Sequence, residues 1–263
     1  MNRNFLLAID LGNSAISFCL FNSDRVLRHG FCRSNDIPFI VGWISREVGD
    51  NKQISCIISS VVPHFTLKLV RSLKQNKSIN KVMIVGKDIV IRVPMKYRRD
   101  MLGADRLVNV YGARKLYPLP VLIFDFGTAI TVDYVSRKGV FEGGLIIPGV
   151  ELSARALEDS AALIPKIGRF KPVQGLVGRD TRSSFSSGLF NGFGSLADGL
   201  IKRFKRRYGT KMTVIATGGF AKRIARFVDG FHYVDELHTL KSLELIYRKE
   251  VREKFPRGIF SKC

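Results

Sequence analysis

One short pattern occurs twice in this chain: an apolar run, an aspartate, a glycine and a small polar residue. The first copy is residues 5–9 followed by Asp10-Leu-Gly-Asn-Ser, and the second is residues 121–124 followed by Asp125-Phe-Gly-Thr. Each copy precedes another strand-like run, so each predicts two adjacent strands joined by a glycine turn. Glycine lets backbone N–H groups approach phosphate oxygens, and a carboxylate can hold a cation that neutralises them. Two such turns predict a site that binds a nucleoside triphosphate from both sides.

The other expected elements repeat in the same order in both halves, as strands and helices alternate after each glycine turn. The strands expected in the first half are 5–9, 15–21, 28–32, 54–60 and 82–85, with helices at 38–48, 63–75 and 102–115. The strands expected in the second half are 121–124, 130–135, 143–149, 212–216 and 231–234, with helices at 151–163, 185–208 and 238–254.

This duplication predicts two similar α/β lobes, each a mixed sheet with flanking helices, with the nucleotide in the cleft between them. Pro118 and Pro120 place the boundary between residues 1–117 and 118–263. A single doubly wound sheet is the competing architecture. Its GxGxxG fingerprint is absent, as is the GxxxxGK[ST] phosphate loop.

Composition narrows the class of protein. The 263 residues suffice for one large domain or two ordinary ones, and 46% are hydrophobic. No apolar run approaches the ~20 residues that span a bilayer, and residues 1–10 do not resemble a signal peptide. The four cysteines, at positions 19, 32, 56 and 263, include no CxxC pair. We therefore expect free thiols, a cytoplasmic location and no membrane association.

The formal net charge of +21 raises the question of a nucleic-acid partner. Basic residues are densest at 202–226, where Lys202-Arg-Phe-Lys-Arg-Arg is followed by further Lys and Arg without an acid. We favour the solvated face of a helix. A contact with nucleic acid, acidic lipid or an acidic partner is the alternative.

Six motifs occur in an order that resembles the type III pantothenate kinases, over residues 5–220. The motifs are Asp10-Leu-Gly-Asn-Ser, Gly103-Ala-Asp-Arg, Asp125-Phe-Gly-Thr-Ala-Ile-Thr, Gly143-Gly-Leu-Ile-Ile-Pro-Gly, Gly178-Arg-Asp-Thr with Ser187-Gly188, and Thr217-Gly-Gly. The family belongs to the superfamily of actin, sugar kinases and heat-shock ATPases. The resemblance therefore implies actin-like, ribonuclease H-like lobes and transfer of the ATP γ-phosphoryl group to pantothenate, the first step toward coenzyme A.

The resemblance implies an ATP-binding loop at the first glycine turn, where Ser14 replaces the usual threonine but keeps its hydroxyl. The residues expected to contact ATP there are Asp10, Leu11, Gly12, Asn13, Ser14, Ala15, Ile16 and Ser17. Asp10 would also hold Mg²⁺ through water. Without the family, a simple β-turn with an Asx interaction is the alternative.

Within the Gly103-Ala104-Asp105-Arg106 motif, Asp105 matches the family's proton acceptor for the attacking hydroxyl. A lone aspartate here would otherwise be interpreted as the N-cap of the following helix. Arg106 would supply a cation for the substrate carboxylate or the migrating charge. Without the family it would be a surface arginine of the helix. All four residues are expected to line the pantothenate site.

The second glycine turn matches the residues that the family uses for a monovalent cation and for phosphate. Asp125 would hold K⁺ or NH₄⁺, and Thr128 would contact ATP phosphate. The glycines of the Gly143–149 and Thr217–219 motifs would allow close backbone approach in the cleft, or serve as packing turns.

Thr181 matches a threonine that the family presents to pantothenate from the neighbouring subunit, which implies a homodimer with shared sites. Its neighbour Asp180 replaces the usual asparagine, and this extra charge would need Arg179 or Arg182 as a partner. Tyr97 lies six residues before Gly103 rather than the usual seven, which implies a one-residue deletion between them. The resemblance implies that Tyr97 contacts pantothenate despite this deletion.

Three hypotheses follow for the function. The first is an active pantothenate kinase. The second is a non-catalytic accessory protein that binds nucleic acid, for which the basic charge is the only support. The third is a kinase of the same superfamily that acts on another small polyol or acid.

Overall fold

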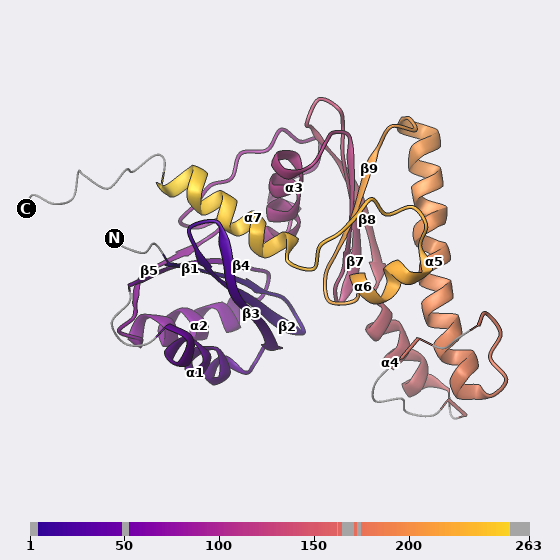
Figure 1. The fold of residues 1–263 in the computed structure, drawn as a ribbon, viewed down its shortest axis with the longest axis horizontal. Coiled ribbons are helices and arrows are strands. Elements are labelled where there is room, and N and C mark those ends of the chain that lie inside the picture. The colour runs from indigo at the N-terminus through magenta and orange to yellow at the C-terminus, as the bar shows by residue number, and fades with distance from the viewer. Residues whose placement is uncertain (1–4, 49–52, 162, 165–170, 173–174, 253–263) are drawn as a thin grey trace, which may run out of the picture. The chain divides into compact units, whose positions relative to one another are not determined.

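The computed structural model describes residues 5–48, 53–161, 163–164, 171–172 and 175–252. It contains two five-stranded mixed sheets with flanking helices (Figure 1). The described chain divides into two compact units, each with one sheet and its own core. Within the residues that the structure describes, no helix combines the length and the apolar composition that crossing a lipid bilayer would require.

The first sheet has the strand order β3-β2-β1-β4-β5. Its strands are β1 (Phe5–Leu11), β2 (Ala15–Asn22), β3 (Arg25–Arg33), β4 (Ile54–Ser60) and β5 (Ile79–Ile84). β1, β2 and β3 pair antiparallel, whereas β1, β4 and β5 pair parallel. The carboxyl ends of β1 and β4 therefore lie side by side, and the first glycine turn follows β1.

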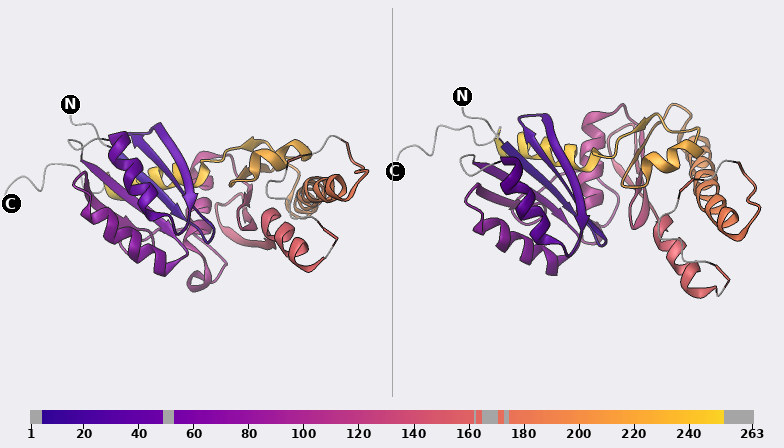
Figure 2. Two further views of the ribbon diagram at one scale, coloured as in Figure 1. Left: turned by 90° about the horizontal axis from the view of Figure 1, so that it is seen from below. Right: turned by 60° about the horizontal axis from the view of Figure 1, so that its bottom comes forward.

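Helices cover both faces of this sheet (Figure 2). Alternate apolar residues of β1, β2 and β4 pack with α1 (Ile37–Val48) and α2 (Pro63–Gln75) in one core. α7 (His238–Ile246) packs against β1, β2 and β4 and meets α3 (Ala104–Leu116) closely at Gly112, where a Cβ would lie 1.8 Å from Ser242 Oγ. Tyr247–Arg252 continue α7 as a π-helix, and residues 253–254 of the helix expected at 238–254 lie outside the described residues.

The second sheet has the strand order β10-β9-β6-β7-β8. Its strands are β6 (Val121–Phe126), β7 (Ala129–Val135), β8 (Phe141–Pro148), β9 (Thr213–Thr217) and β10 (Tyr233–Val234). Its core packs one face of the sheet against α4 (Val150–Ser160), α5 (Thr181–Tyr208) and α6 (Ala221–Ile224). β6, β7 and β8 pair antiparallel, and β6, β9 and β10 pair parallel.

The two sheets therefore have the same topology, strand for strand. This confirms the predicted fold class of duplicated mixed sheets with flanking helices. α5 begins at Thr181, four residues before the expected start, because Asp180 and Ser183 form a reciprocal capping box. β10 is confined to two residues where a four-residue strand was expected.

The compact units are not two continuous segments of sequence. The first contains the described residues up to Val93, then Arg98–Lys115 and the described residues from His238 onward; the second contains Pro94–Tyr97 and Leu116–Leu237. After Arg98–Lys115 the chain returns to the second unit at Leu116, beside the boundary expected between residues 117 and 118. The segment from His238 differs from that expectation because the apolar face of α7, with Leu240 and Leu243 buried, packs on the first sheet.

Candidate active site

The first glycine turn joins β1 to β2 and has an exposed tip. Gly12 N donates to Ala15 O at 2.9 Å, which closes the turn. Ser34 Oγ donates to Gly12 O at 2.7 Å, and Ser34 N donates to Ser14 O at 3.2 Å. These two carbonyl oxygens therefore accept hydrogen bonds from Ser34. At the tip of the turn, free carbonyl oxygens would repel a phosphate. Sequence reasoning missed Ser34 because no local pattern links it to a turn 20 residues earlier.

The eight residues expected to bind ATP differ in what they can present. Asn13, Ser14 and Ala15 are exposed at the tip. The side chains of Leu11 and Ile16 are fully buried in the core of the first unit, so these two could contact a ligand only through their backbone. The remaining three, Asp10, Gly12 and Ser17, are half-buried beside the turn.

Asp105 lies in the same unit, in the first turn of α3. Val61 N, just beyond β4, donates to Leu11 O at 3.3 Å, which joins the ends of β4 and β1. A Cβ on Gly103 would lie 2.6 Å from Asp105 Oδ1 and 3.5 Å from Val61 Cγ1. The missing side chain of Gly103 therefore leaves the room that the Asp105 carboxylate occupies. Asp105 thus lies at the sheet edge that carries the first glycine turn.

Asp105 is not the N-cap of α3, the alternative that its sequence context allowed. The helix begins at Ala104, and Asp105 Oδ1 accepts a hydrogen bond of 2.7 Å from Arg106 N. Burial raises the pKa of the Asp105 carboxyl, against the lowering effects of the Arg106 N–H and the Arg106 charge. Arg106 is only 6% exposed, so it is not a surface arginine. A half-buried carboxylate with a raised pKa is a suitable proton acceptor.

Two glycines pack against the second turn, which joins β6 to β7. Gly149 N donates to Thr128 O at 3.0 Å, and a Cβ on Gly149 would lie 2.3 Å from that oxygen. A Cβ on Gly218 would lie 2.5 Å from Asp125 Oδ1, and the Gly218 φ is +90°. The glycine motifs at 143–149 and 217–219 therefore support the Asp125 turn, while Thr128 is exposed at its tip.

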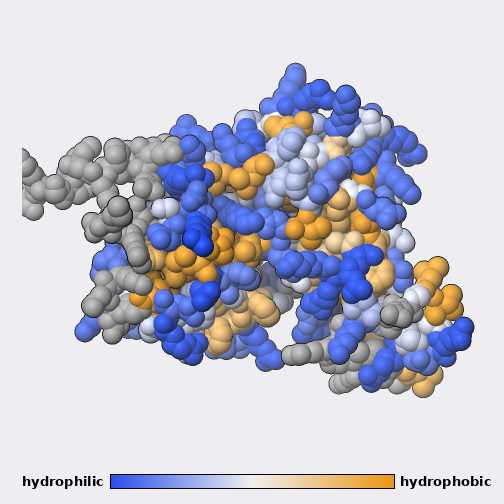
Figure 3. Space-filling view, in the orientation of Figure 1, coloured by the Kyte–Doolittle hydropathy of each residue, from blue (hydrophilic) through white to orange (hydrophobic). Residues whose placement is uncertain are grey.

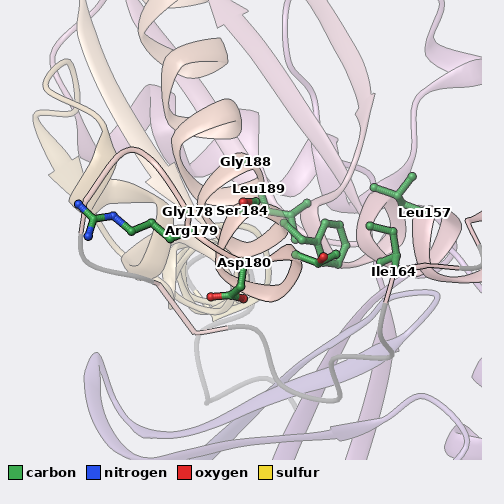
Figure 4. Close-up of a pocket in the computed structure, with 10 residues that line it drawn as sticks. Leu157, Ile164, Gly178, Arg179, Asp180, Ser184, Gly188 and Leu189 are labelled. Carbon is green, nitrogen blue, oxygen red and sulfur yellow. The ribbon is translucent and has the colours of Figure 1, made fainter.

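Thr181 lines a surface pocket of about 720 Å³ at the start of α5 (Figure 4). The lining residues are Leu157, Ile164, Gly178, Arg179, Asp180, Thr181, Ser184, Phe185, Gly188 and Leu189. In Figure 4 Arg179 extends to the side opposite the apolar side chains of Leu157 and Ile164. The pocket therefore has an apolar wall, and its other lining residues include the hydroxyl groups of Thr181 and Ser184 and the oppositely charged Arg179 and Asp180.

The charge of Asp180, the departure from the family pattern, is used by the helix itself. Asp180 Oδ1 accepts from Ser183 N at 2.9 Å and Asp180 Oδ2 accepts from Ser183 Oγ at 2.7 Å. These hydrogen bonds, with a smaller contribution from the Arg182 charge, lower the pKa of Asp180. Asparagine and aspartate are both good N-caps, so this exchange preserves the start of α5.

Tyr97 lies in the second unit, whereas Asp105 lies in the first. Its ring centroid is 5.6 Å from that of Phe141, and it packs near Gly143 of β8. The neighbouring Lys96 Nζ forms an ion pair of 2.7 Å with Glu142 Oε2. Tyr97 is thus held on β8, and its expected contact with pantothenate stays a prediction.

Comparisons with known proteins identify the family of this chain. The family model of the type III pantothenate kinases matches residues 6–203. A type III pantothenate kinase of Halalkalibacterium halodurans is 40% identical over 255 residues, covering 94% of this chain and 100% of the relative. One of Hyphomonas neptunium is 34% identical over 253 residues, covering 93% and 99%.

Solved structures share the fold at low sequence identity. A Campylobacter jejuni protein described as a Baf family transcriptional activator is 20% identical, with a TM-score of 0.58 and coverage of 92% of this chain and 97% of its own. A Sinorhizobium meliloti protein described as a 2-dehydro-3-deoxygalactonokinase is 12% identical, with a TM-score of 0.58 and coverage of 96% and 98%. The sequence matches at high coverage, with the motif residues placed as described above, show that the chain belongs to the type III pantothenate kinase family.

Proposed function

We propose that this chain is a pantothenate kinase, which transfers the γ-phosphoryl group of ATP to pantothenate and yields 4′-phosphopantothenate and ADP. Family membership supports the reaction, and the observation that carries the catalytic assignment is the position of Asp105. Its carboxylate is half-buried, has a raised pKa, and lies at the edge of the first sheet that bears the glycine turn.

Asp105 accepts the proton of the primary hydroxyl of pantothenate as that oxygen bonds to the γ-phosphorus. The bond from the γ-phosphorus to the bridging oxygen breaks, and ADP leaves with the electron pair. General-base assistance of this kind contributes roughly 10²–10⁴ in rate. The charge of the buried Arg106 lowers the pKa of Asp105, and we expect Arg106 to interact with anionic groups of the substrate near that carboxylate.

The two glycine turns supply phosphate contacts. At the first turn, Asn13 and Ser14 offer polar groups at the exposed tip while Ser34 engages the two carbonyl oxygens. At the second turn, Thr128 offers its hydroxyl. Such turns bind phosphate through N–H and O–H donors with little steric barrier.

Cations complete the chemistry. Mg²⁺, which ATP-dependent kinases require, would neutralise phosphate charge, with Asp10 holding it through water. Among the described residues no three His, Cys, Asp or Glu side chains gather in a cluster suited to a metal ion. Mg²⁺ would therefore take most of its ligands from phosphate oxygens and water. Asp125, packed against Gly218, is the residue that would hold K⁺ or NH₄⁺.

We further propose a homodimer with shared active sites. In it, Thr181 and its pocket contact the pantothenate that is bound in the active site of the partner subunit. Large apolar side chains are exposed next to this pocket and suit burial in an interface. Leu163 is 91% exposed, Val177 78% and Leu176 73%. Figure 3 shows apolar surface at its lower right, in the region between α4 and α5 of Figure 1. On α5, a Cβ on Gly188 or Gly192 would meet only open space, which would allow close approach of a second copy.

A reducing compartment, the cytoplasm, suits the three described cysteines, which are free thiols. Burial raises the pKa of Cys19 to about 12 and that of Cys32 to about 11. Thiols with such raised pKa values are poor nucleophiles at neutral pH, which is consistent with a structural role.

The test is ADP release by purified protein with and without pantothenate, at several K⁺ concentrations, with the product identified by mass spectrometry. We expect ADP release that depends on pantothenate and that is lost in Asp105→Asn. Absence of pantothenate-dependent release from the wild-type protein would refute the proposal, and release with a different acid or polyol would favour the third hypothesis.

The non-catalytic, nucleic-acid-binding alternative is not favoured. Its support is the net charge and the exposed basic residues near the end of α5, such as Arg206 and Arg207. Basic residues in the last turn of a helix are stabilised by the helix dipole, which explains them without a partner. Retention on DNA that weakens with salt, without turnover, would favour this alternative.

A further inference from the structure

Each sheet carries a row of three polar residues at the same place: an aspartate at the end of its central strand and a hydroxyl residue on each neighbouring strand. The strand registers give these rows directly. They are Ser17–Asp10–Ser59 in the first sheet and Thr131–Asp125–Thr217 in the second.

Residues opposite one another on neighbouring strands lie about 4.8 Å apart, with their side chains on the same face of the sheet. The core clusters of the two units contain the residues of β1 and β6 that alternate with Asp10 and Asp125. Each row therefore lies on the face of its sheet opposite the helices of that core. The row is thus a property of the duplicated fold and not of one local motif. Each row comes directly before a glycine turn.

One hydroxyl in each row is fully buried and has no hydrogen-bond partner in the part of the chain that the structure describes. Ser59 and Thr217 are both 0% exposed, and neither Ser59 Oγ nor Thr217 Oγ1 has a partner among the described residues. Ser59 and Thr217 carry the only fully buried hydroxyls without a partner among the described residues; Ser242 Oγ, by contrast, donates to His238 O at 2.7 Å. A buried hydroxyl without a partner lowers stability, so two of them at equivalent positions suggest a role in a bound state.

Carboxylates that hold cations are themselves oriented by hydrogen bonds from neighbouring groups. We propose that Ser59 and Thr217 are positioning residues: when the neighbouring aspartate binds its cation, each hydroxyl donates to one carboxylate oxygen and leaves the other oxygen facing the cation or its water. This inference rests on the proposed function, because it takes Asp10 and Asp125 as the cation-binding residues.

Thr217→Val removes the hydroxyl and keeps the shape of the side chain. Thr217→Ser keeps the hydroxyl and should behave as a rescue. Thr213→Val is the matched control, because Thr213 lies four residues earlier on β9 and on the same face. The measurement is the melting temperature with ADP and Mg²⁺ over a series of K⁺ concentrations, which reports cation binding without turnover.

We expect the ligand-free Thr217→Val protein to melt at the wild-type temperature or above, since an unpartnered hydroxyl is replaced by a methyl group. The K⁺ concentration for half of the maximal stabilisation should rise about tenfold or more. Thr217→Ser should remain near wild type, and Thr213→Val should not alter the K⁺ response. An unchanged K⁺ response in Thr217→Val, or the same change in Thr213→Val, would overturn the inference.

The first row gives a parallel test with Mg²⁺. Ser59→Ala should raise the Mg²⁺ concentration needed for half of the maximal stabilisation by ADP. Ser55→Ala is its control on the same strand and face, where Ser55 Oγ instead donates to Asn80 Oδ1 at 3.4 Å. An equal shift in both variants would mean that the effect is one of strand packing, and would overturn the inference.

Asp125→Ala in the K⁺ series separates the inference from the proposed function. If Asp125→Ala abolishes the K⁺ response and Thr217→Val leaves it intact, only the role of the hydroxyl is wrong. If Asp125→Ala leaves the K⁺ response intact, the cation assignment fails and the inference fails with it.

Discussion

Gly218 combines a left-handed backbone with close packing on Asp125, so the structure predicts a large effect of one added methyl group there. Its φ is +90°, and a Cβ would lie 2.5 Å from Asp125 Oδ1 and 2.7 Å from Phe126 N and C. Gly219 next to it is a matched control, because a Cβ there would meet no heavy atom within 4 Å. The two Gly→Ala variants therefore differ in strain and contact while being identical in chemistry.

The expected effects follow from these distances. Left-handed backbone at alanine costs about 1–2 kcal/mol, and overpacking a filled site typically costs about 1–3 kcal/mol more. Gly218→Ala should therefore lose about 2–5 kcal/mol of unfolding free energy, or at least roughly 4 °C in Tm. Ordinary contact begins at 3.4 Å, so the Asp125 carboxylate must move by about 0.9 Å from 2.5 Å. A displacement of about 1 Å at a site can lower the rate roughly 100-fold.

The assay combines thermal melting with turnover at saturating ATP and pantothenate over a K⁺ series. The unfolding free energy of Gly219→Ala should lie within about 1 kcal/mol of the wild-type value, or slightly above it, because alanine reduces the entropy of the unfolded chain. Its cation response should be that of wild type. If Gly218→Ala melts and responds to K⁺ like Gly219→Ala, the close packing of Gly218 on Asp125 does not constrain the site.

Three further predictions concern catalysis. Asp105→Asn should lower kcat by roughly 10²–10⁴, and a wild-type kcat would remove Asp105 from the mechanism. Its Tm at pH 7 should be no lower than that of wild type, because the asparagine Oδ1 still accepts a hydrogen bond from Arg106 N. In addition, the wild-type carboxyl has a raised pKa, so its ionisation destabilises the folded state as pH rises. Since burial raises the pKa of Asp105, kcat/KM should fall as the pH drops below a pKa higher than that of an ordinary aspartate. Arg106→Met should shift this fall in kcat/KM to higher pH, because the Arg106 charge lowers the Asp105 pKa. An unchanged pH profile in Arg106→Met would contradict the role of Arg106. Thr181→Ala should raise KM for pantothenate more than KM for ATP, and mixed dimers with Asp105→Asn should regain activity; no recovery would refute the shared site.

The strands and the two glycine turns were predictable because their signals are local. Apolar runs of strand length, an aspartate and a glycine define β1 and β6 with errors of one or two residues at their ends. The start of α5 was less accurate, because the capping box uses Ser183 in place of the more common acidic residue at that position.

The candidate site was predictable in part. The motif residues Asp10, Asp105 and Asp125 could be named in advance through the resemblance to a family. The contribution of Ser34, which engages the carbonyl oxygens of the first turn, could not, because it depends on where β3 ends relative to the turn. The buried state of Arg106 was likewise missed, because burial of one helix residue depends on which elements cover that face.

Local sterics and periodicity, which are written in neighbouring residues, were enough to specify the duplicated strands, the glycine turns and the family. Long-range packing specified the rest. The parallel register of β1 with β4 and of β6 with β9 brings Ser59 to Asp10 and Thr217 to Asp125, from positions far apart in sequence. Burial then raises the pKa of Asp105, and desolvation of a carboxylate is a property of its surroundings in space and not of its neighbours along the chain.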